Sequence, residues 1–153
     1  MKLATLCYIR QNGRTLMLHR IKKENDMHEG KWNGLGGKFE EWETPEECAI
    51  REIEEESGLK VKNPKLKVFL TFPAFDTIET WYVWVFVIDE FEWEMIESPE
   101  WVLEWIDNDK LLSLNLWEWD KVFLKCLDQE WLFSGKFIYE DYRLIDYTFE
   151  RVL

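Results

Sequence analysis

Cysteine and histidine are scarce in this sequence. Its three cysteines, Cys7, Cys48 and Cys126, stand far apart, and the only histidines are His19 and His28. An odd number of widely spaced cysteines argues against a disulfide framework and against a structural zinc site. Two histidines are too few to build a transition-metal centre from imidazoles. We therefore expect a reducing, cytoplasmic location, and we expect any bound metal to have carboxylate ligands.

Long hydrophobic runs and positive charge are also in short supply. The longest apolar stretch lies near residues 81–88, far too short to cross a bilayer, and residues 1–10 lack the pattern of a secretory signal. Lys and Arg total 19 against 31 Asp and Glu, so the net charge is −12. Such an acidic chain disfavours contact with nucleic-acid backbones and anionic membranes. We expect neither as a partner.

Apolar residues, in contrast, are plentiful. The chain has 153 residues, of which 46% are hydrophobic and 16% aromatic, enough to bury a full core. No internal repeat or linker interrupts it. The length predicts a single domain over residues 1–153, present as a monomer or a weak dimer.

Strand and helix patterns alternate along the chain. The strands are predicted at residues 4–10, 15–21, 66–72, 81–88, 102–106, 131–139 and 143–152. Asn12-Gly13 is typical of a hairpin turn, and the nearly continuous apolar run at 81–88 indicates a central strand. We expect a loop at 22–31, a short strand or loop at 32–39, and a helix at 116–127. This mixture favours a sheet covered by helices on both faces.

A further helix has clear signals at both of its ends. Thr44 is a typical N-cap residue, Pro45 fits the first helical position, and Glu47 completes a capping box. Gly58 is placed to end the helix with a left-handed residue. The predicted helix therefore covers residues 45–57.

Three glutamates gather on one face of this helix. At 100° per residue, Glu52, Glu55 and Glu56 fall within about one turn of each other. Like charges at this spacing repel and raise one another's pKa unless a cation is shared between them. The pattern favours a site for Mg²⁺ or Mn²⁺. A generic run of glutamates would instead be a solvated helix face.

The residues around these glutamates resemble the signature of the Nudix hydrolases. That signature is Gly, five residues, Glu, seven residues, Arg-Glu, an aliphatic, any residue, Glu-Glu, any residue, Gly and an aliphatic. Each fixed position is filled here, by Gly37, Glu43, Arg51, Glu52, Ile53, Glu55, Glu56, Gly58 and Leu59. The resemblance implies an α/β/α sandwich with a mixed central sheet, of the α+β class. It also implies a loop–helix–loop that holds Mg²⁺ against the pyrophosphate of a substrate.

The resemblance assigns roles to the residues of this segment. It implies that the carbonyl of Gly37 and the carboxylates of Glu52, Glu55 and Glu56 hold the metal, and that Glu52 or Glu56 is the general base. Which of the two acts as the base stays open.

Other charged residues receive supporting roles from the same resemblance. Glu43 and Arg51 would orient the loop and the ligands. Lys38 would contact a phosphate, or be an ordinary surface lysine. Glu100, after Pro99, stands where the family often supplies another carboxylate, at the metal or as the base, although exposed loop glutamates are also common.

Nearly the whole chain resembles the MutT-type oxidised-purine nucleoside triphosphatases. The matching stretches are 32–34, 36–38, 116–120 and 144–148. The resemblance implies hydrolysis of a triphosphate such as 8-oxo-dGTP to the monophosphate and pyrophosphate, which would clean the nucleotide pool. It further implies that Asn33 and Asp120 bind the purine edge and that Trp117 stacks on the ring. Phe72 and Trp81 would line the pocket, unless these aromatic residues only build the core.

Two alternatives stay open at this point. The chain would also suit a Nudix pyrophosphatase for another nucleoside di- or triphosphate derivative. A non-catalytic nucleotide-binding module is the other alternative, although the intact Glu52, Glu55 and Glu56 argue against it.

Four tryptophans stand where glycine would be natural: Trp42, Trp93, Trp101 and Trp119. The family usually has glycine at position 42, where a Cβ at positive φ would cost about 1–2 kcal/mol. We hypothesise that the coding frame contains UGA codons that the native cell reads as glycine. Natural aromatic substitution is the alternative, and UGG codons at these positions would exclude recoding.

Overall fold

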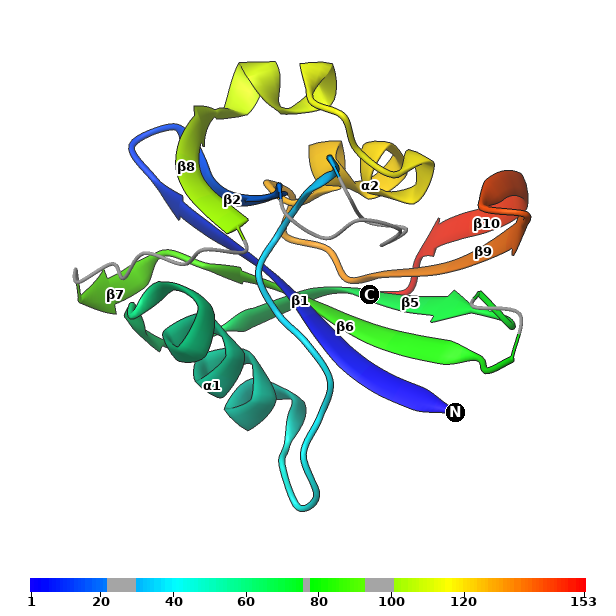
Figure 1. Ribbon diagram of the computed structural model, residues 1–153, viewed down its shortest axis with the longest axis horizontal. Coiled ribbons are helices and arrows are strands. Elements are labelled where there is room, and N and C mark those ends of the chain that lie inside the picture. Colours follow the sequence, from blue (N-terminus) through cyan, green and yellow to red (C-terminus); the bar gives the residue numbers. More distant parts are fainter. Residues whose placement is uncertain (22–29, 76–77, 93–100) are drawn as a thin grey trace.

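A computed structural model describes residues 1–21, 30–75, 78–92 and 101–153, and most of its strands form one mixed sheet (Figure 1). These strands are β1 (Lys2–Gln11), β2 (Arg14–Arg20), β3 (Trp32–Asn33), β5 (Lys65–Phe72), β6 (Trp81–Ile88), β8 (Trp101–Asp107), β9 (Phe133–Glu140) and β10 (Arg143–Arg151). Their order is β10-β9-β5-β6-β1-β2-β3, and β8 also pairs with β2. The pairs β1–β6 and β5–β9 are parallel and the other pairs antiparallel, so the predicted mixed sheet with β6 inside it is confirmed.

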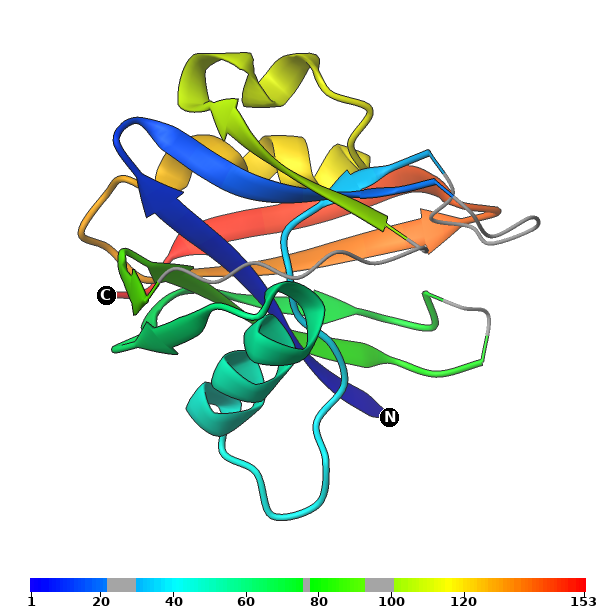
Figure 2. The ribbon, with the colours of Figure 1, turned by 60° about the vertical axis from the view of Figure 1, so that its left-hand side comes forward.

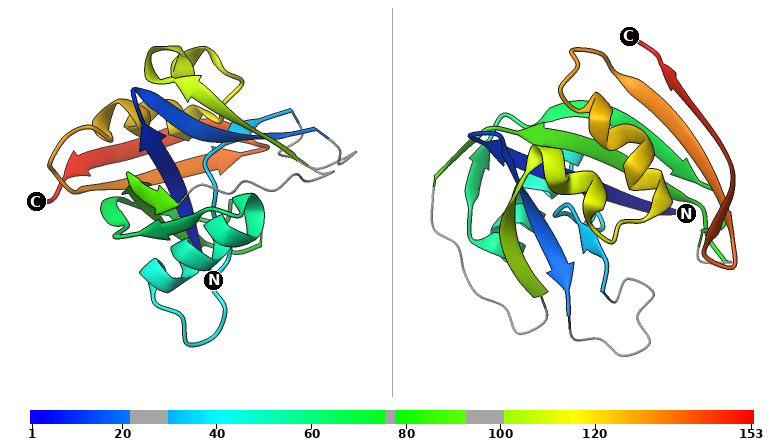
Figure 3. Two further views of the ribbon diagram at one scale, coloured as in Figure 1. Left: turned by 90° about the vertical axis from the view of Figure 1, so that its left-hand side faces the viewer. Right: turned by 90° about the horizontal axis from the view of Figure 1, so that it is seen from above.

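Two α-helices cover opposite faces of this sheet (Figure 2). They are α1 (Pro45–Ser57) and α2 (Glu118–Phe123), and the 3₁₀ helices η1 (Asn108–Ser113) and η2 (Leu124–Cys126) adjoin α2 in the chain. Figure 3 shows the same layers from two further directions. This arrangement confirms the predicted α/β/α sandwich. Among the described residues, no helix combines the length and the apolar character needed to cross a membrane.

The alternation of side chains along β1 explains why both faces are covered. Leu6 and Tyr8 pack into the core beneath α2, and Cys7 and Ile9 pack into a second core with Ile53 of α1. Successive residues of a strand point to opposite faces, so one buried strand supplies two cores. β1 therefore connects the two helices through the centre of the fold.

The predicted elements differ from the structure in two places. The helix expected at 116–127 is divided into α2 and η2, because Trp117 has extended backbone angles and the last turn tightens to 3₁₀ geometry. The stretch 32–39, predicted as a short strand or loop, agrees with the structure: residues 32–33 form a strand, and Leu35 and Lys38 form isolated bridges to β1. The other predicted strands begin and end within two residues of the observed ones. The short pair β4 (Lys60–Lys62) and β7 (Glu90–Glu92) was not predicted.

Trp42 has the left-handed backbone that the sequence suggested for this position. Its φ is 72°, and 98% of the residue is exposed, so its indole contributes no buried contact that would repay the strain. We predict that Trp42→Gly raises the free energy of unfolding by about 1 kcal/mol, measured by urea denaturation. Trp42→Ala is the matched control, because it removes the indole but keeps the Cβ. Equal stabilities of the Gly and Ala variants would contradict the strain argument.

Candidate active site

The ends of α1 are fixed by the residues that the sequence indicated. Thr44 Oγ1 accepts a hydrogen bond from the backbone N–H of Glu47 at 3.1 Å, and Glu47 Oε1 accepts one from the N–H of Thr44 at 3.0 Å. Gly58 has φ of 80° and donates its N–H to the carbonyl of Glu54 at 2.8 Å. The predicted capping box and left-handed end are thus confirmed. They fix which face of the helix its glutamates occupy.

A glycine loop lies directly against the acidic face of α1. The N–H of Gly36 donates to Glu56 Oε1 at 2.7 Å. A Cβ on Gly37 would lie 2.6 Å from the carboxyl carbon of Glu52, and a Cβ on Gly36 would lie 2.2 Å from the carbonyl oxygen of Thr5. No side chain therefore fits between the loop and α1 at Gly37, or between the loop and β1 at Gly36, and the carboxylates approach the backbone closely.

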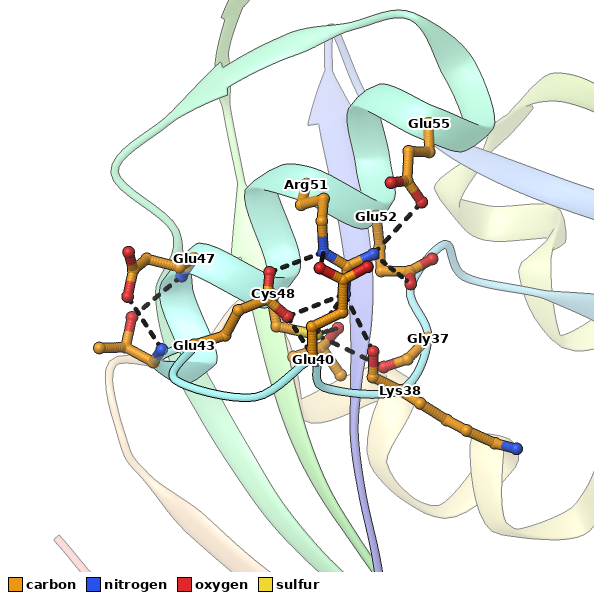
Figure 4. A network of polar contacts seen from close by, with 11 residues as sticks. Gly37, Lys38, Glu40, Glu43, Glu47, Cys48, Arg51, Glu52 and Glu55 are labelled. Carbon is orange, nitrogen blue, oxygen red and sulfur yellow. Dashed lines mark hydrogen bonds and ion pairs between the residues drawn. The ribbon is translucent and has the colours of Figure 1, made fainter.

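Arg51 holds the loop and the helix together (Figure 4). Its Nε and Nη2 donate to the two carboxylate oxygens of Glu43 at 2.6 and 2.8 Å, and Nη2 also donates to the carbonyl of Lys38 at 3.0 Å. Its Nη1 donates to Glu52 at 2.8 Å and to Glu55 at 3.2 Å. The bond from Arg51 holds the pKa of Glu43 below its usual value, and the carboxylates of Glu43 and Glu52 raise the pKa of Arg51. A fork-shaped guanidinium suits this position because it binds a carboxylate with two donors.

Glu56 lies in a different electrostatic environment from Glu43. Burial raises the pKa of Glu56 to about 8, and the negative charges of Glu52 and Glu55 act in the same direction. The N–H of Gly36 and the positive charge of Arg20 partly offset this rise. A buried carboxyl among like charges becomes ionised more easily when a cation lies beside it.

The donor groups fit a hard divalent cation. Glu52, Glu55 and Glu56 offer oxygen ligands from one helix face, and burial of Glu56 among negative charges is relieved by positive charge. Within the described ranges, no three acidic, histidine or cysteine side chains are already gathered around one point. The guanidinium of Arg51, which bonds both Glu52 and Glu55, occupies part of that space.

Two of the expected ligands, the carbonyl of Gly37 and Glu100, stay predictions. The carbonyl of Gly37 accepts the N–H of Thr5 at 2.8 Å and faces the thiol of Cys48 at 3.6 Å, so its role toward a metal stays a prediction. Glu100 lies outside the described residues, as does Trp93.

A cavity of about 180 Å³ adjoins the glycine loop. Its walls are formed by Ala4, Thr5, Leu6, Arg20, Asn33, Gly34, Gly36, Gly37, Phe72, Phe75, Trp81, Val83 and Trp119. Three of the residues expected to contact the base, Asn33, Phe72 and Trp81, are thus brought together. The side chain of Lys38 points away from Arg51, and its amine lies 5.6 Å from the centre of the Trp81 ring (Figure 4).

Arg20 was missed by the sequence analysis. It lies at the end of β2, lines the cavity and lowers the pKa of Glu56 by its charge. No motif surrounds it in the sequence. Its place in the cavity wall depends on the position of β2 in the sheet, which the sequence does not show. An arginine at the end of a strand, before a polar loop, is only a weak signal of a site residue.

Trp117 and Asp120 are not among the residues that line this cavity. Trp117 is buried and packs edge-on against Phe75 and Tyr139. The amine of Lys31 lies 5.0 Å from the centre of its ring. Asp120 is fully buried, and its Oδ1 accepts the hydroxyl of Tyr8 at 2.5 Å. Their expected contacts with a base stay predictions.

Burial of Asp120 predicts a pH-dependent stability. Burial raises the pKa of this carboxyl from 3.8 to about 7, while Tyr8 and Lys31 act to lower it. Because the folded pKa is raised, the contribution of Asp120 is fully present below about pH 3.8 and is lost as the pH rises through about 7. The loss is on the order of 2–4 kcal/mol. Urea denaturation at about pH 4 and about pH 8 should show a larger loss in the native chain than in Asp120→Asn. Equal losses in the two proteins would contradict this assignment.

Comparison with known proteins agrees with this geometry. The sequence profile of the NUDIX domain matches residues 1–127. The oxidized purine nucleoside triphosphate hydrolase of Danio rerio is 35% identical over 144 residues, covering 94% of this chain and 90% of the relative. The mouse (Mus musculus) protein of the same name is 33% identical over 140 residues, covering 92% and 88% of the two chains.

The fold is shared with MutT proteins of known structure. The crystal structure of a MutT protein from Bacillus halodurans matches with a TM-score of 0.87 and 33% identity, and 98% of each chain is covered. Nudix hydrolases generally use a divalent metal, in agreement with the carboxylates found here. The signature residues of α1 are bonded to the glycine loop, and the NUDIX profile matches most of the chain. The chain therefore belongs to the Nudix hydrolase family.

Proposed function

We propose that this enzyme is a Mg²⁺-dependent diphosphatase that converts oxidised purine nucleoside triphosphates, such as 8-oxo-dGTP, to the monophosphate and pyrophosphate. One observation carries the proposal: the glycine loop, whose Gly36 N–H bonds Glu56 on the acidic face of α1, forms part of the wall of a cavity that is lined by aromatic side chains. A triphosphate linked to a purine has the matching arrangement of charge and flat ring. The names of the similar fish and mouse proteins support the same substrate class.

The phosphate end of the substrate would meet the charged groups around the glycine loop. Glu52, Glu55 and Glu56 would hold Mg²⁺, or Mn²⁺ in its place. A bound cation neutralises phosphate oxygens and makes an attacking water more acidic. Lys38 and Arg20 offer positive charge at the cavity edge and wall, respectively.

Glu56 suits the role of general base. A base works best when its pKa lies near the working pH; burial raises the pKa of Glu56 to about 8, and a cation held beside it would lower that pKa. Glu52 accepts a hydrogen bond from Arg51 at 2.8 Å. It therefore suits the role of a fixed metal ligand better than that of a proton acceptor. Glu43 and Arg51 would act by positioning the loop and the helix.

The base end of the substrate would lie among Asn33, Phe72 and Trp81. An amide both donates and accepts hydrogen bonds, so Asn33 is able to bind a purine edge. Aromatic faces add about 1–3 kcal/mol for each stacked base without regard to its identity. Trp117, which the resemblance placed against the ring, would act from behind Phe75 in this arrangement.

The whole chain would act as one domain. The strands β9 and β10 lie beyond residue 127, where the family profile ends, yet β9 pairs with β5 in the same sheet. We infer a monomer or weak dimer without nucleic-acid polymers as partners, in line with the net charge of −12. The free cysteines Cys7, Cys48 and Cys126 fit a reducing cytoplasm.

A Nudix pyrophosphatase for another nucleotide derivative is the second candidate. Trp119, in the cavity wall, favours it, because its bulk narrows the space for a base. Steady-state assays with Mg²⁺ across ordinary and oxidised nucleoside triphosphates and nucleoside diphosphate derivatives separate the two. Highest kcat/KM for an oxidised purine triphosphate supports the first proposal. Hydrolysis of diphosphate derivatives alone would favour the second, and tight binding without turnover would indicate a nucleotide-binding module.

A further inference from the structure

The strand β10 forms one edge of the sheet. It pairs with β9 and ends the strand order of the described residues. The right-hand view of Figure 3 shows β10 (red) at the outer rim of the sheet, to one side of α2. An edge strand leaves a row of backbone N–H and C=O groups outside the ladder, where another extended chain is able to pair. β10 therefore presents a strand edge to its surroundings.

The backbone of β10 directs Tyr147 and Phe149 toward this edge. The N–H of Val152 donates to the carbonyl of Leu132, so the even-numbered residues of this regular stretch bond toward β9. The backbone groups of the odd-numbered residues consequently point outward. In agreement, the N–H of Tyr147 donates to the side chain of its own neighbour, Asp146 Oδ1, at 2.9 Å. A carbonyl of an incoming strand can take the place of that carboxylate.

A groove lies between β10 and the helices α2 and η2. Its volume is about 460 Å³, and the residues that line it include Glu118, Lys121, Val122 and Lys125 on the helical side and Tyr147 and Phe149 on β10. None of its lining residues also lines the cavity beside the glycine loop. The groove is therefore a separate feature of the surface, next to the edge of the sheet.

The β10 wall of the groove is aromatic. Tyr147 lies opposite Phe137 of β9, with the two rings stacked at 5.4 Å, and the ring of Phe149 stacks on Phe133 at 5.2 Å. Because Phe133 and Phe137 belong to the core beneath α2, Tyr147 and Phe149 point to the same face of the sheet. Tyr147 is nevertheless 48% exposed. An apolar side chain inserted between α2 and β10 would bury this surface.

The helical wall of the groove carries positive charge. Lys121 and Lys125 lie on it with a single carboxylate, Glu118, which accepts from Lys121 at 3.1 Å. Two lysines against one glutamate leave one positive charge at the groove, in a chain whose net charge is −12. Such a local reversal of sign favours an acidic partner and disfavours a basic one.

A second copy of β10 is a poor occupant of this edge. Antiparallel pairing centred on Tyr147 would place Arg143 opposite Arg151. Pairing centred on Asp146 would place that aspartate opposite its own copy. Like charges directly opposite each other destabilise a sheet. The register shift between Leu144 and Asp146 also breaks the alternation of β10, which shortens any such pairing. The edge is thus better suited to a different chain.

We propose that the edge of β10 and its groove bind an extended acidic segment of another protein by strand addition. Residues of that segment opposite Tyr147 and Phe149 pair with their outward backbone groups and direct apolar side chains into the groove. Carboxylates that flank these apolar residues meet Lys121 and Lys125. The surface leaves the cavity beside the glycine loop open, so the inference does not depend on the proposed substrate.

Titration of the ¹⁵N-labelled native chain with a capped peptide tests the inference. The probe is Glu-Thr-Val-Thr-Val-Thr-Val-Thr-Glu, which reads the same in both directions and so suits either strand orientation. We expect saturable binding with a Kd of about 10–500 µM and amide shifts centred on β10, α2 and η2. Amide hydrogen exchange at Tyr147 and Phe149 should slow at least about 10-fold in the saturated complex. Serine in place of every valine should weaken binding at least about 10-fold.

Reversal of one charge at the groove tests the role of the lysines. Lys125→Glu should weaken binding of the probe about 3- to 10-fold, and it should strengthen binding of a probe that has lysine at both ends. Lys62→Glu is the matched control, because it makes the same charge change at an exposed site on β4. It should alter the Kd of the probe less than about 2-fold.

Several results would overturn the inference. They are an absence of saturable shifts up to about 2 mM probe, shifts centred on another surface, and equal binding of the valine and serine peptides. A dimer in light scattering whose formation protects the amides of β10 would assign the edge to a second copy instead. Unchanged exchange at Tyr147 and Phe149 in a saturated complex would show that the groove binds side chains without strand addition, which also contradicts the proposal.

Discussion

Glu56→Gln is expected to lower kcat by about 10²- to 10⁴-fold, the range over which a positioned general base contributes. Glutamine keeps an oxygen that accepts the N–H of Gly36, as Glu56 does at 2.7 Å. It cannot accept a proton from water, and it is a weaker metal ligand. The substitution also removes a buried carboxyl whose pKa is raised to about 8, so the free energy of unfolding should not fall. Steady-state kinetics and urea denaturation of the same preparation measure both effects.

Glu54→Gln is the matched control for this experiment. Glu54 belongs to the same helix and is exposed, away from the face shared by Glu52, Glu55 and Glu56. Its kcat should stay within about 2-fold of the native value, as is usual for a surface substitution. Near-normal turnover in Glu56→Gln would remove Glu56 from the mechanism.

Arg51→Ala is expected to destabilise the fold by about 3 kcal/mol and to lower kcat at least 10-fold. The arginine side chain is 20% exposed, and its loss leaves the carboxylates of Glu43 and Glu52, at 13% and 17% exposure, without their guanidinium. It also breaks the bond to the carbonyl of Lys38, which ties the glycine loop to α1. The loop and the ligands would then no longer be held in one geometry.

Two further variants separate the effect of the Arg51 charge from the effect of its hydrogen-bond geometry. Arg51→Lys keeps the positive charge but loses the two-donor fork to Glu43, so it should recover only part of the stability. Lys121→Ala breaks the exposed pair with Glu118 and should cost less than about 1 kcal/mol. If Arg51→Ala proved as mild as Lys121→Ala in chemical denaturation, the role given to Arg51 would be wrong.

Local signals explain how much of the fold was predictable. The cap at Thr44, the glycine at position 58 and the spacing of Glu52, Glu55 and Glu56 all lie within one short segment. Such features depend on helical geometry alone, and the structure confirms α1 and its caps. The mixed sheet and the two covered faces followed from the alternation of strand and helix patterns and from the family resemblance.

The cavity could not be predicted in the same way, because distant segments meet there. The bond between Tyr8 and Asp120 joins residues 112 positions apart, and no local pattern indicates it. Arg20 reaches the cavity only through the pairing of β2 with its neighbours. The resemblance placed Asp120 at the base, yet its carboxyl is fully buried and is not among the residues that line the cavity. That burial is a matter of packing rather than of sequence spacing.

Trp42 and Trp119 also bear on the recoding hypothesis. Trp42 has a backbone conformation that favours glycine, and the indole N–H of Trp119, in the cavity wall, is buried without a partner among the described residues. Glycine at position 42 would relieve the backbone strain, and glycine at position 119 would remove the unpaired indole. The codons at positions 42 and 119 are the direct evidence. UGG at both would show that tryptophan is native, and UGA at both would support glycine in the living cell.

Hydrolysis of 8-oxo-dGTP in ¹⁸O-labelled water with Mg²⁺ tests the central claim most directly. If water attacks the β-phosphorus, as the family resemblance implies, mass spectrometry should find equal amounts of 8-oxo-dGMP and pyrophosphate, with the label in pyrophosphate. Chelation of the metal should stop the reaction, and added Mg²⁺ should restore it. Release of inorganic phosphate in place of pyrophosphate, or no product from any nucleoside triphosphate, would contradict the account.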